Sequence, residues 1–332
     1  MDENTETADA ADAAAHVPGT GGVADPGDPQ PAPHEGLFSA ERSAEVVAAA
    51  FARTPDDRLR EVLTSLTGHL HAFVKDVGLT PAEWRSAIAF LTDTGRTCGE
   101  TRQEFVLLSD VLGVSMLVDT LANGTLGDAT ESTVEGPFHV VASPPRALGD
   151  DINDDGRAGL PCLFTGRVLD PEGAPVAGAL VDVWQADAEG YYDVQLPGGA
   201  PAGNLRGLFT TDADGAYRFR TIVPRHYPIP DDGPVGRLLR ATRRHPNRPA
   251  HIHLEVSAPG LRTLTTHLFV AGSPYLDSDA VFGVKESLVR EFTPVDDPEK
   301  AVAAGLPCPY RTVDFPVTLR RDEPGPAPGD GA

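Results

Sequence analysis

Cysteine and positive charge are both scarce in this chain of 332 residues. The 3 cysteines (Cys98, Cys162 and Cys308) are odd in number and far apart, so neither a disulfide framework nor a zinc knuckle is indicated. The chain has 27 basic against 49 acidic residues, a formal net charge of −22. This charge argues against nucleic acid or an anionic membrane surface as a partner. A small organic ligand agrees better with it.

Long hydrophobic runs are also missing. No apolar stretch approaches the ~18 residues that a membrane helix needs. The first residues lack the basic start and the apolar core of a signal peptide. We therefore expect a soluble, cytoplasmic protein without membrane insertion.

Composition divides the chain into four parts. Residues 1–37 are acidic, rich in Ala, Pro and Gly, and have no Lys or Arg, which predicts a disordered leader. Residues 38–131 have apolar residues at helical spacing and predict a helical module. Residues 132–320 consist of short β-branched runs between Gly, Pro and Asp turns, which predicts a β-sandwich. Residues 321–332 read as a loose tail. The fold class expected is mainly β, with an N-terminal helical module for dimerisation.

Helix-start signals recur in the helical module. Helices are expected at about 40–51 and 54–76, and "TPAE" at residues 80–83 is a capping box with proline at the first helical position. "TRQE" at 101–104 reads as a second box. It opens one predicted helix whose apolar side chains follow helical steps: Phe105, Leu108, Leu112, Met116 and Leu117.

The stretch "RPAHIHLEV" at residues 248–256 carries the clearest chemistry. His251 and His253 alternate with apolar residues in a predicted strand, so both imidazoles project from one face. That geometry is suited to a metal ion, with Glu255 or His267 as a possible third ligand. Two histidines on a polar sheet face are the alternative. "DINDDG" at residues 151–156 begins like a calcium loop, but position twelve is Cys162, so a plain turn is expected.

Several segments resemble a known family in order and spacing. They are "PCLFTGRVLD", "VDVWQADAEGYYD", "NLRGLFTTDADGAYRFRTIVP", "YPIP", "RPAHIHLEVSAPG" and "LTTHLFVAG". Together they are similar to the intradiol ring-cleaving dioxygenases, the catechol 1,2-dioxygenase group. The resemblance implies Fe(III) held by Tyr192, Tyr227, His251 and His253, with Tyr191 as the alternative to its neighbour. Ferric iron favours anionic oxygen, and a phenol of pKa ~10 loses its proton on such a cation.

"EGPFHV", "YPIPDDGPVGRLL", "FVLLSDVLGVSMLVD" and "DAVFGVKESLV" resemble the hydroxyquinol 1,2-dioxygenase branch in particular. By that resemblance Arg248 steadies negative charge on the substrate, its alternative being an ion pair with Asp231 or Asp232. Asp110 could accept a hydrogen bond from the third hydroxyl of benzene-1,2,4-triol. The implied substrate pocket comprises Leu107, Asp110, Val134, Glu135, Gly136, Pro137, Phe138, Ile229, Pro230, Arg248 and Val281.

The resemblance also implies a mechanism and an assembly. By this resemblance Tyr227 leaves the metal and accepts a substrate proton, and oxygen is inserted between the two hydroxylated carbons. The implied product is 3-hydroxy-cis,cis-muconate, a tautomer of maleylacetate. A homodimer through the helical module is expected, with a lipid between its helices. Three alternatives stay open: a catechol or chlorocatechol 1,2-dioxygenase, a zinc hydrolase on His251, His253 and His267, and a metal-free β-sandwich binding module.

Overall fold

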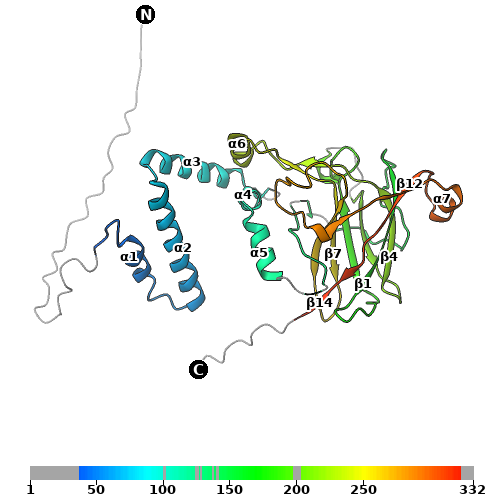
Figure 1. The fold of residues 1–332 in the computed structure, drawn as a ribbon, viewed down its shortest axis with the longest axis horizontal. Coiled ribbons are helices and arrows are strands. Elements are labelled where there is room, and N and C mark those ends of the chain that lie inside the picture. The colour runs from blue at the N-terminus through cyan, green and yellow to red at the C-terminus, as the bar shows by residue number, and fades with distance from the viewer. Residues whose placement is uncertain are drawn as a thin grey trace, which may run out of the picture. The chain divides into compact units, whose positions relative to one another are not determined.

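The computed structural model describes residues 37–99, 102–123, 127, 129–136, 138–139, 142–196 and 203–322. They form two compact units, which divide between Trp84 and Arg85. Figure 1 shows helices in the N-terminal part of the chain and sheets in the later part. The predicted leader, apart from Leu37, and the predicted tail beyond Asp322 lie outside the described residues. Their disorder and the proposed domain boundaries stay predictions.

The first unit contains α1 (Ser43–Ala50), α2 (Asp57–Val77) and the start of α3 (Pro81–Thr97). Asp56 begins α2, because its side chain accepts a hydrogen bond from the backbone of Leu59 at 2.8 Å. The capping box that begins α3 has formed: Glu83 accepts from the backbone N–H of Thr80 at 2.9 Å, and Thr80 Oγ1 accepts from the backbone of Glu83 at 3.3 Å. The predicted start of α3 is confirmed, and α2 begins at Asp57, three residues after the predicted start at about 54.

The prediction of a single helix from residue 102 onward is wrong. The chain forms α4 (Glu104–Val111) and α5 (Val114–Asn123), which are bent by 75°. Gly113 lies between them with φ of +71°, a left-handed conformation that ends a helix. The second capping box also differs from its prediction. Glu104 is the first residue of α4, and its buried carboxylate accepts from Arg102 and from the backbone of Val235, while Thr101 lies outside the described residues.

The second unit contains two five-stranded sheets, which confirms the predicted β-sandwich. The first runs β11-β12-β1-β13 with β4 on β1: β1 (Pro161–Leu169), β4 (Ala216–Ile222), β11 (Thr293–Val295), β12 (Tyr310–Asp314) and β13 (Val317–Thr318). The second runs β10-β9-β7-β2-β3: β2 (Leu180–Gln185), β3 (Arg206–Thr210), β7 (His251–Ser257), β9 (Leu264–Val270) and β10 (Val289–Arg290). One buried apolar cluster joins both sheets and includes Phe164, Phe219, Phe209, Val183 and Ile252.

Short elements connect and flank these sheets. β5 (Tyr227–Pro228) pairs with β6 (Asn247–Arg248), and β8 (Leu261–Arg262) pairs with β14 (Arg320–Arg321). The remaining helices are α6 (Pro234–Ala241), α7 (Pro298–Ala304), η1 (Asp193–Gln195) and η2 (Glu286–Leu288). Residues 151–156 form a turn, as predicted. Within the described residues no single helix is long and apolar enough to cross a membrane, although α4 and α5 pass that test as a bent pair.

Strand β7 is the element that positions the site. It lies between β2 and β9, with antiparallel pairing on both edges. His251 and His253 on this strand are buried, whereas Glu255 is partly exposed. Burying polar side chains is costly unless they have polar partners, so the histidines of β7 need a specific environment.

Candidate metal centre

His251 and His253 occupy one face of β7, and each is 1% exposed. The Nδ1–H of His251 donates to the carbonyl of Pro249 at 2.7 Å, so its Nε2 presents a lone pair. Burial lowers the pKa of both imidazoles well below the usual value, and for His251 the positive charge of Arg248 adds to this effect. The two rings are therefore neutral and available as ligands.

Tyr192 and Tyr227 approach the histidines from short elements. Tyr227 belongs to β5, and Tyr192 precedes η1, where the side chain of Gln195 accepts from its backbone N–H at 2.9 Å. Gly190 has φ of +94°, and a Cβ there would lie 3.1 Å from Cβ of Tyr227, so glycine lets the two segments approach. Tyr192 is 1% exposed, whereas Tyr191 is 48% exposed. This difference favours Tyr192 over its neighbour as a ligand.

The four predicted ligands bring their donor atoms together in a closed ring. The oxygen of Tyr192 lies 3.2 Å from that of Tyr227 and 3.0 Å from Nε2 of His253. Nε2 of His251 lies 3.3 Å from the oxygen of Tyr227 and 3.1 Å from Nε2 of His253. Donors that share one ion at about 2 Å lie roughly 3 Å from one another. The spacing of this ring therefore fits a single metal ion.

The chemistry of the ring also fits a cation. Burial raises the pKa of Tyr192 well above the usual value and raises the pKa of Tyr227. A bound cation reverses this effect, because it stabilises the phenolate that burial disfavours. Two neutral imidazoles and two potential phenolates form a hard, anionic donor set of the kind that suits a trivalent ion.

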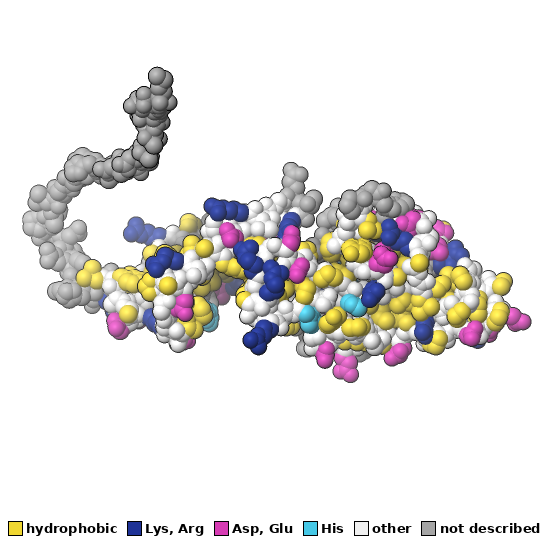
Figure 2. Space-filling model, turned by 90° about the horizontal axis from the view of Figure 1, so that it is seen from above, with side chains coloured by type: hydrophobic (Ala, Val, Ile, Leu, Met, Phe, Trp, Pro, Cys, Tyr) yellow, Lys and Arg dark blue, Asp and Glu magenta, His cyan; other side chains and the backbone are white. Residues whose placement is uncertain are grey.

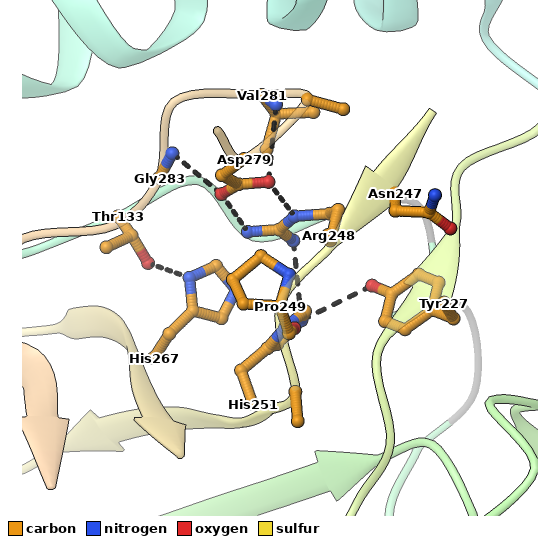
Figure 3. A network of polar contacts seen from close by, with 12 residues as sticks. Thr133, Tyr227, Asn247, Arg248, Pro249, His251, His267, Asp279, Val281 and Gly283 are labelled. Atoms are coloured by element: carbon orange, nitrogen blue, oxygen red, sulfur yellow. Dashed lines mark hydrogen bonds and ion pairs between the residues drawn. The ribbon is translucent and has the colours of Figure 1, made fainter. Parts of the chain in front are cut away.

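Arg248 lies at the edge of this ring. It pairs with Tyr227 across β5 and β6, is 2% exposed, and its Nη1 lies 3.4 Å from Nε2 of His251. Its ion-pair partner is Asp279, with Nε 3.2 Å from Oδ1 (Figure 3). The alternative pairing with Asp231 or Asp232 is wrong, because these two carboxylates pair with other arginines.

The predicted substrate pocket is partly assembled around one apolar cluster. Three predicted pocket residues are buried in this cluster: Leu107, Ile229 and Val281. Val111 and Val235 belong to the same cluster, and the predicted residue Val134 packs against it. Asp110, at the end of α4, is 6% exposed, and burial raises its pKa while the charge of Arg248 opposes that effect. Pro230 is half-buried. Pro137 lies outside the described residues. The substrate contacts themselves stay predictions.

The segment that follows Val134 lies against the donor ring. A Cβ added to Gly136 would lie 3.2 Å from Cε1 of His253, and the ring of Phe138 stacks on Tyr192 with centroids 4.5 Å apart. Glu135 differs from these neighbours. Its side chain is 54% exposed and its carboxylate bonds Nδ1 of His139 at 2.6 Å. A role for Glu135 in substrate binding stays a prediction.

His139 and Trp184 were not predicted as site residues, although they stack behind the predicted ligand His253. Trp184 stacks on His253 with centroids 4.7 Å apart, and His139 stacks on Trp184 at 4.2 Å. Hydrogen bonds to Asp182 and then to Glu135 raise the pKa of His139 to about 9, so a charged imidazole covers the indole. No local sequence pattern could have revealed this arrangement, because Asp182 and Trp184 lie on a different segment from His139.

His267 was predicted as a possible third histidine ligand. It lies opposite His253 between β7 and β9, and ligand atoms of His251, His253 and His267 lie within 4.8 Å of one another. Its Nδ1 lies 2.6 Å from Oγ1 of Thr133. Glu255, the other predicted third ligand, instead groups with Glu135 and His139. The buried histidines therefore offer a metal-binding group even before the tyrosines are counted.

Comparisons with known proteins show the family of this chain. The family model described as "Dioxygenase" matches residues 134–316, and "Catechol dioxygenase N terminus" matches residues 56–130. Hydroxyquinol 1,2-dioxygenase of a Rhizobium strain is 53% identical over 82% of this chain and 92% of its own. Catechol 1,2-dioxygenase of Candida albicans is 37% identical over 83% and 90%. The solved hydroxyquinol 1,2-dioxygenase of Pseudomonas putida has a TM-score of 0.79 at 45% identity, over 85% of this chain and 99% of its own.

The chain belongs to the intradiol ring-cleaving dioxygenases of the catechol 1,2-dioxygenase group. The resemblance inferred from the motifs is thereby confirmed, and so is the prediction of an oxidoreductase that uses O2. The reading as a binding module without enzymatic activity is wrong.

Proposed function

We propose that this dioxygenase acts on hydroxyquinol and opens the ring between adjacent hydroxylated carbons, giving 3-hydroxy-cis,cis-muconate or its tautomer maleylacetate. Both oxygen atoms of O2 enter the product. The hydroxyquinol enzyme of Rhizobium is 53% identical to the chain, against 37% for the catechol enzyme of Candida. That difference favours a triol over a plain diol. Nucleic acid is not part of the proposal, since the net charge is −22.

The ring of donor atoms, with neighbours 3.0 to 3.3 Å apart, is the observation that carries the proposal. We infer that Tyr192, Tyr227, His251 and His253 hold Fe(III). When bound, this ion supplies the Lewis acidity and electron exchange that make a diol reactive toward O2.

The residues around the ring supply proton transfer and charge. As a phenolate, the oxygen of Tyr227 would accept a proton from a substrate hydroxyl. Arg248 lies opposite it and lowers the phenol pKa against the effect of burial, which favours the phenolate form. The guanidinium of Arg248 also stabilises negative charge on the bound ring. Leu107, Ile229 and Val281 form an apolar wall that excludes water and orients the ring.

Asp110 gives the pocket a preference for a third hydroxyl. It is a buried carboxylate at the end of α4, next to Leu107 and Val111 of the apolar cluster. A substrate hydroxyl that donates to this carboxylate compensates for its burial, whereas catechol leaves it without that partner. Catechol leaves this buried carboxylate with Ser115 as its hydrogen-bond partner and without the one that a third hydroxyl adds, which favours the triol.

Assembly as a homodimer is part of the proposal. Helix α2 has no buried residue. Five of its apolar side chains recur at helical spacing and are each 48–55% exposed: Leu59, Leu66, Leu70, Phe73 and Val77. Figure 2 shows apolar side chains at the surface of the N-terminal helices. A second copy of the chain, with a lipid between the helices, would cover this face.

A cytoplasmic location is also part of the proposal. Three free cysteines are consistent with a reducing, cytoplasmic location.

Purified protein tested with benzene-1,2,4-triol and with catechol separates the parts of this proposal. Oxygen uptake and product absorbance are expected to give a higher kcat/KM for the triol. A higher value for catechol would overturn the substrate assignment but not the chemistry. Stoichiometric iron and a red colour are expected from tyrosinate ligands, and a colourless protein with activity would overturn the ligand set.

A further inference from the structure

The carboxylate of Asp279 makes four contacts, and none of the predicted site roles includes it. Its Oδ1 accepts from Nε of Arg248 at 3.2 Å, and its Oδ2 accepts from Nη2 at 3.3 Å. The same oxygens accept from the backbone of Val281 at 3.4 Å and of Gly283 at 2.9 Å. Figure 3 shows Asp279 between the guanidinium and the two backbone nitrogens. One buried group therefore joins the arginine to the loop of residues 279–283.

The side-on pair fixes the orientation of the guanidinium. Because Nε and Nη2 of Arg248 are both held by Asp279, the guanidinium plane is set by two bonds. The remaining nitrogen, Nη1, lies 3.4 Å from Nε2 of His251 and so faces the donor ring. An arginine without such a partner has many accessible rotamers. Asp279 thus selects the rotamer that presents positive charge to the place where the substrate binds.

The two backbone contacts fix the pocket wall. Val281, which packs in the apolar cluster with Leu107 and Ile229, is bonded to Asp279 through its N–H. The next residue, Phe282, has φ of +61°, an unfavourable conformation for an aromatic residue that persists only where its surroundings hold it.

Gly283 shows how tightly the loop is fitted to this pair. A Cβ at position 283 would lie 2.9 Å from Nη2 of Arg248 and 3.2 Å from Oδ2 of Asp279. The loop, the carboxylate and the guanidinium are therefore packed as one unit. Arg244 adds a second attachment, since it donates to the carbonyls of Val111 and Ala280.

We propose that Asp279 is a positioning residue that sets the direction of the Arg248 charge. The inference rests on the substrate-binding role proposed for Arg248 and deepens it. It explains why a buried ion pair, which is costly to desolvate, stands beside the donor ring.

Four iron-loaded proteins test this: wild type, Asp279→Asn, Arg248→Met and the double variant. Asp279→Asn is expected to lower kcat by about 100-fold, the effect of misplacing a catalytic group by about 1 Å. In the Arg248→Met background the same change is expected to lower kcat less than about threefold, because Asp279 acts through that arginine. Losses that multiply in the double variant would overturn the proposal.

A second readout does not depend on turnover. Substrate binding without O2, followed by visible absorbance, is expected to weaken in Asp279→Asn and to weaken no further in the double variant. Asp277→Asn, an exposed carboxylate in the same segment, is the matched control and is expected to behave as wild type. If Asp279→Asn does not fold, the double variant is compared with Arg248→Met alone, because the double variant leaves no unpaired buried charge. Equal kcat in these two proteins supports the proposal, and a further large loss in the double variant overturns it.

All kinetic comparisons use whichever of hydroxyquinol and catechol the wild type turns over faster. A preference for catechol would thus overturn the substrate assignment and still leave the coupling between Asp279 and Arg248 measurable. A wild-type protein with neither activity would overturn the proposed function itself, while the binding experiment would still report on Asp279.

Discussion

The donor ring has a strand-borne half and a loop-borne half, and they are built differently. His251 and His253 lie on β7, where pairing with β2 and β9 fixes the backbone on both edges. Tyr192 and Tyr227 lie on the segment before η1 and on the two-residue β5. The first half is positioned by the sheet itself, whereas the second depends on particular side-chain contacts.

Those contacts surround Tyr192 closely. Arg206 on β3 forms a buried ion pair with Asp193, the residue that follows Tyr192, and also donates to the carbonyl of Phe138, whose ring stacks on Tyr192. A loop can therefore hold a ligand as firmly as a strand if buried charge and aromatic packing fix it. The difference between the halves lies in how many separate residues the positioning requires.

The largest effect is expected from the strand-borne half. His253→Ala removes a proposed ligand whose backbone is paired on both edges. We therefore expect loss of iron and a fall in kcat of roughly 10³-fold or more, beyond the ~10–100-fold typical of residues around ligands. Iron content and oxygen uptake measure both. His69→Ala, at an exposed position on α2, is the control. Full iron content in His253→Ala would show that β7 does not supply this ligand.

The loop-borne half is compared by Tyr192→Phe and Tyr191→Phe. Because Tyr192 is buried in the ring and Tyr191 is 48% exposed, only the first is expected to weaken or shift the tyrosinate absorbance, leaving that of Tyr227, and to lower kcat by about 100-fold or more. Iron content is expected to fall only partly, since three donors remain. The reverse pattern, with colour lost in Tyr191→Phe, would reassign the ligand.

The two halves also differ in how well the sequence predicts them. Spacing alone places His251 and His253 on one face, because a strand has a period of two residues. Tyr192 and Tyr227 have no such period and emerge only from the resemblance of several motifs in order. The break at Gly113 was missed, since the apolar steps continue across it and only the backbone shows φ of +71°. Asp279 and His139 were missed because Arg248 and Asp182, the partners that connect them to the site, are distant in sequence.

A smaller and selective effect is expected at Asp110, on the apolar side of the pocket. Asp110→Asn keeps the shape but loses the charge-assisted hydrogen bond, worth about 1.5–3 kcal/mol. We expect kcat/KM for hydroxyquinol to fall about 10–100-fold while that for catechol stays within about threefold. Parallel rates with both substrates measure the ratio. Asp76→Asn, exposed on α2, is the control, and equal losses with both substrates would deny Asp110 a role in specificity.

The smallest effect is expected behind the strand-borne half, at His139. Its pKa of about 9 in the folded protein lies above the usual 6.5, so the charged imidazole stabilises the fold below pH 6.5 and this contribution is lost as the pH rises to 9. His139→Phe keeps the stack on Trp184 without the charge. The difference in melting temperature between wild type and this variant should therefore shrink between pH 6.5 and 9.

Separate substitutions of Asp182 and Glu135 show which carboxylate raises the pKa of His139 more. The bond to Asp182 has the larger influence, so Asp182→Asn should lower the pKa of His139 more than Glu135→Gln does, as measured by NMR titration. Asp182 lies on β2 and Glu135 on the loop, so this pair of variants compares the two kinds of support on a single imidazole. A larger drop in Glu135→Gln would mean that the loop, and not the strand, fixes the charge behind His253.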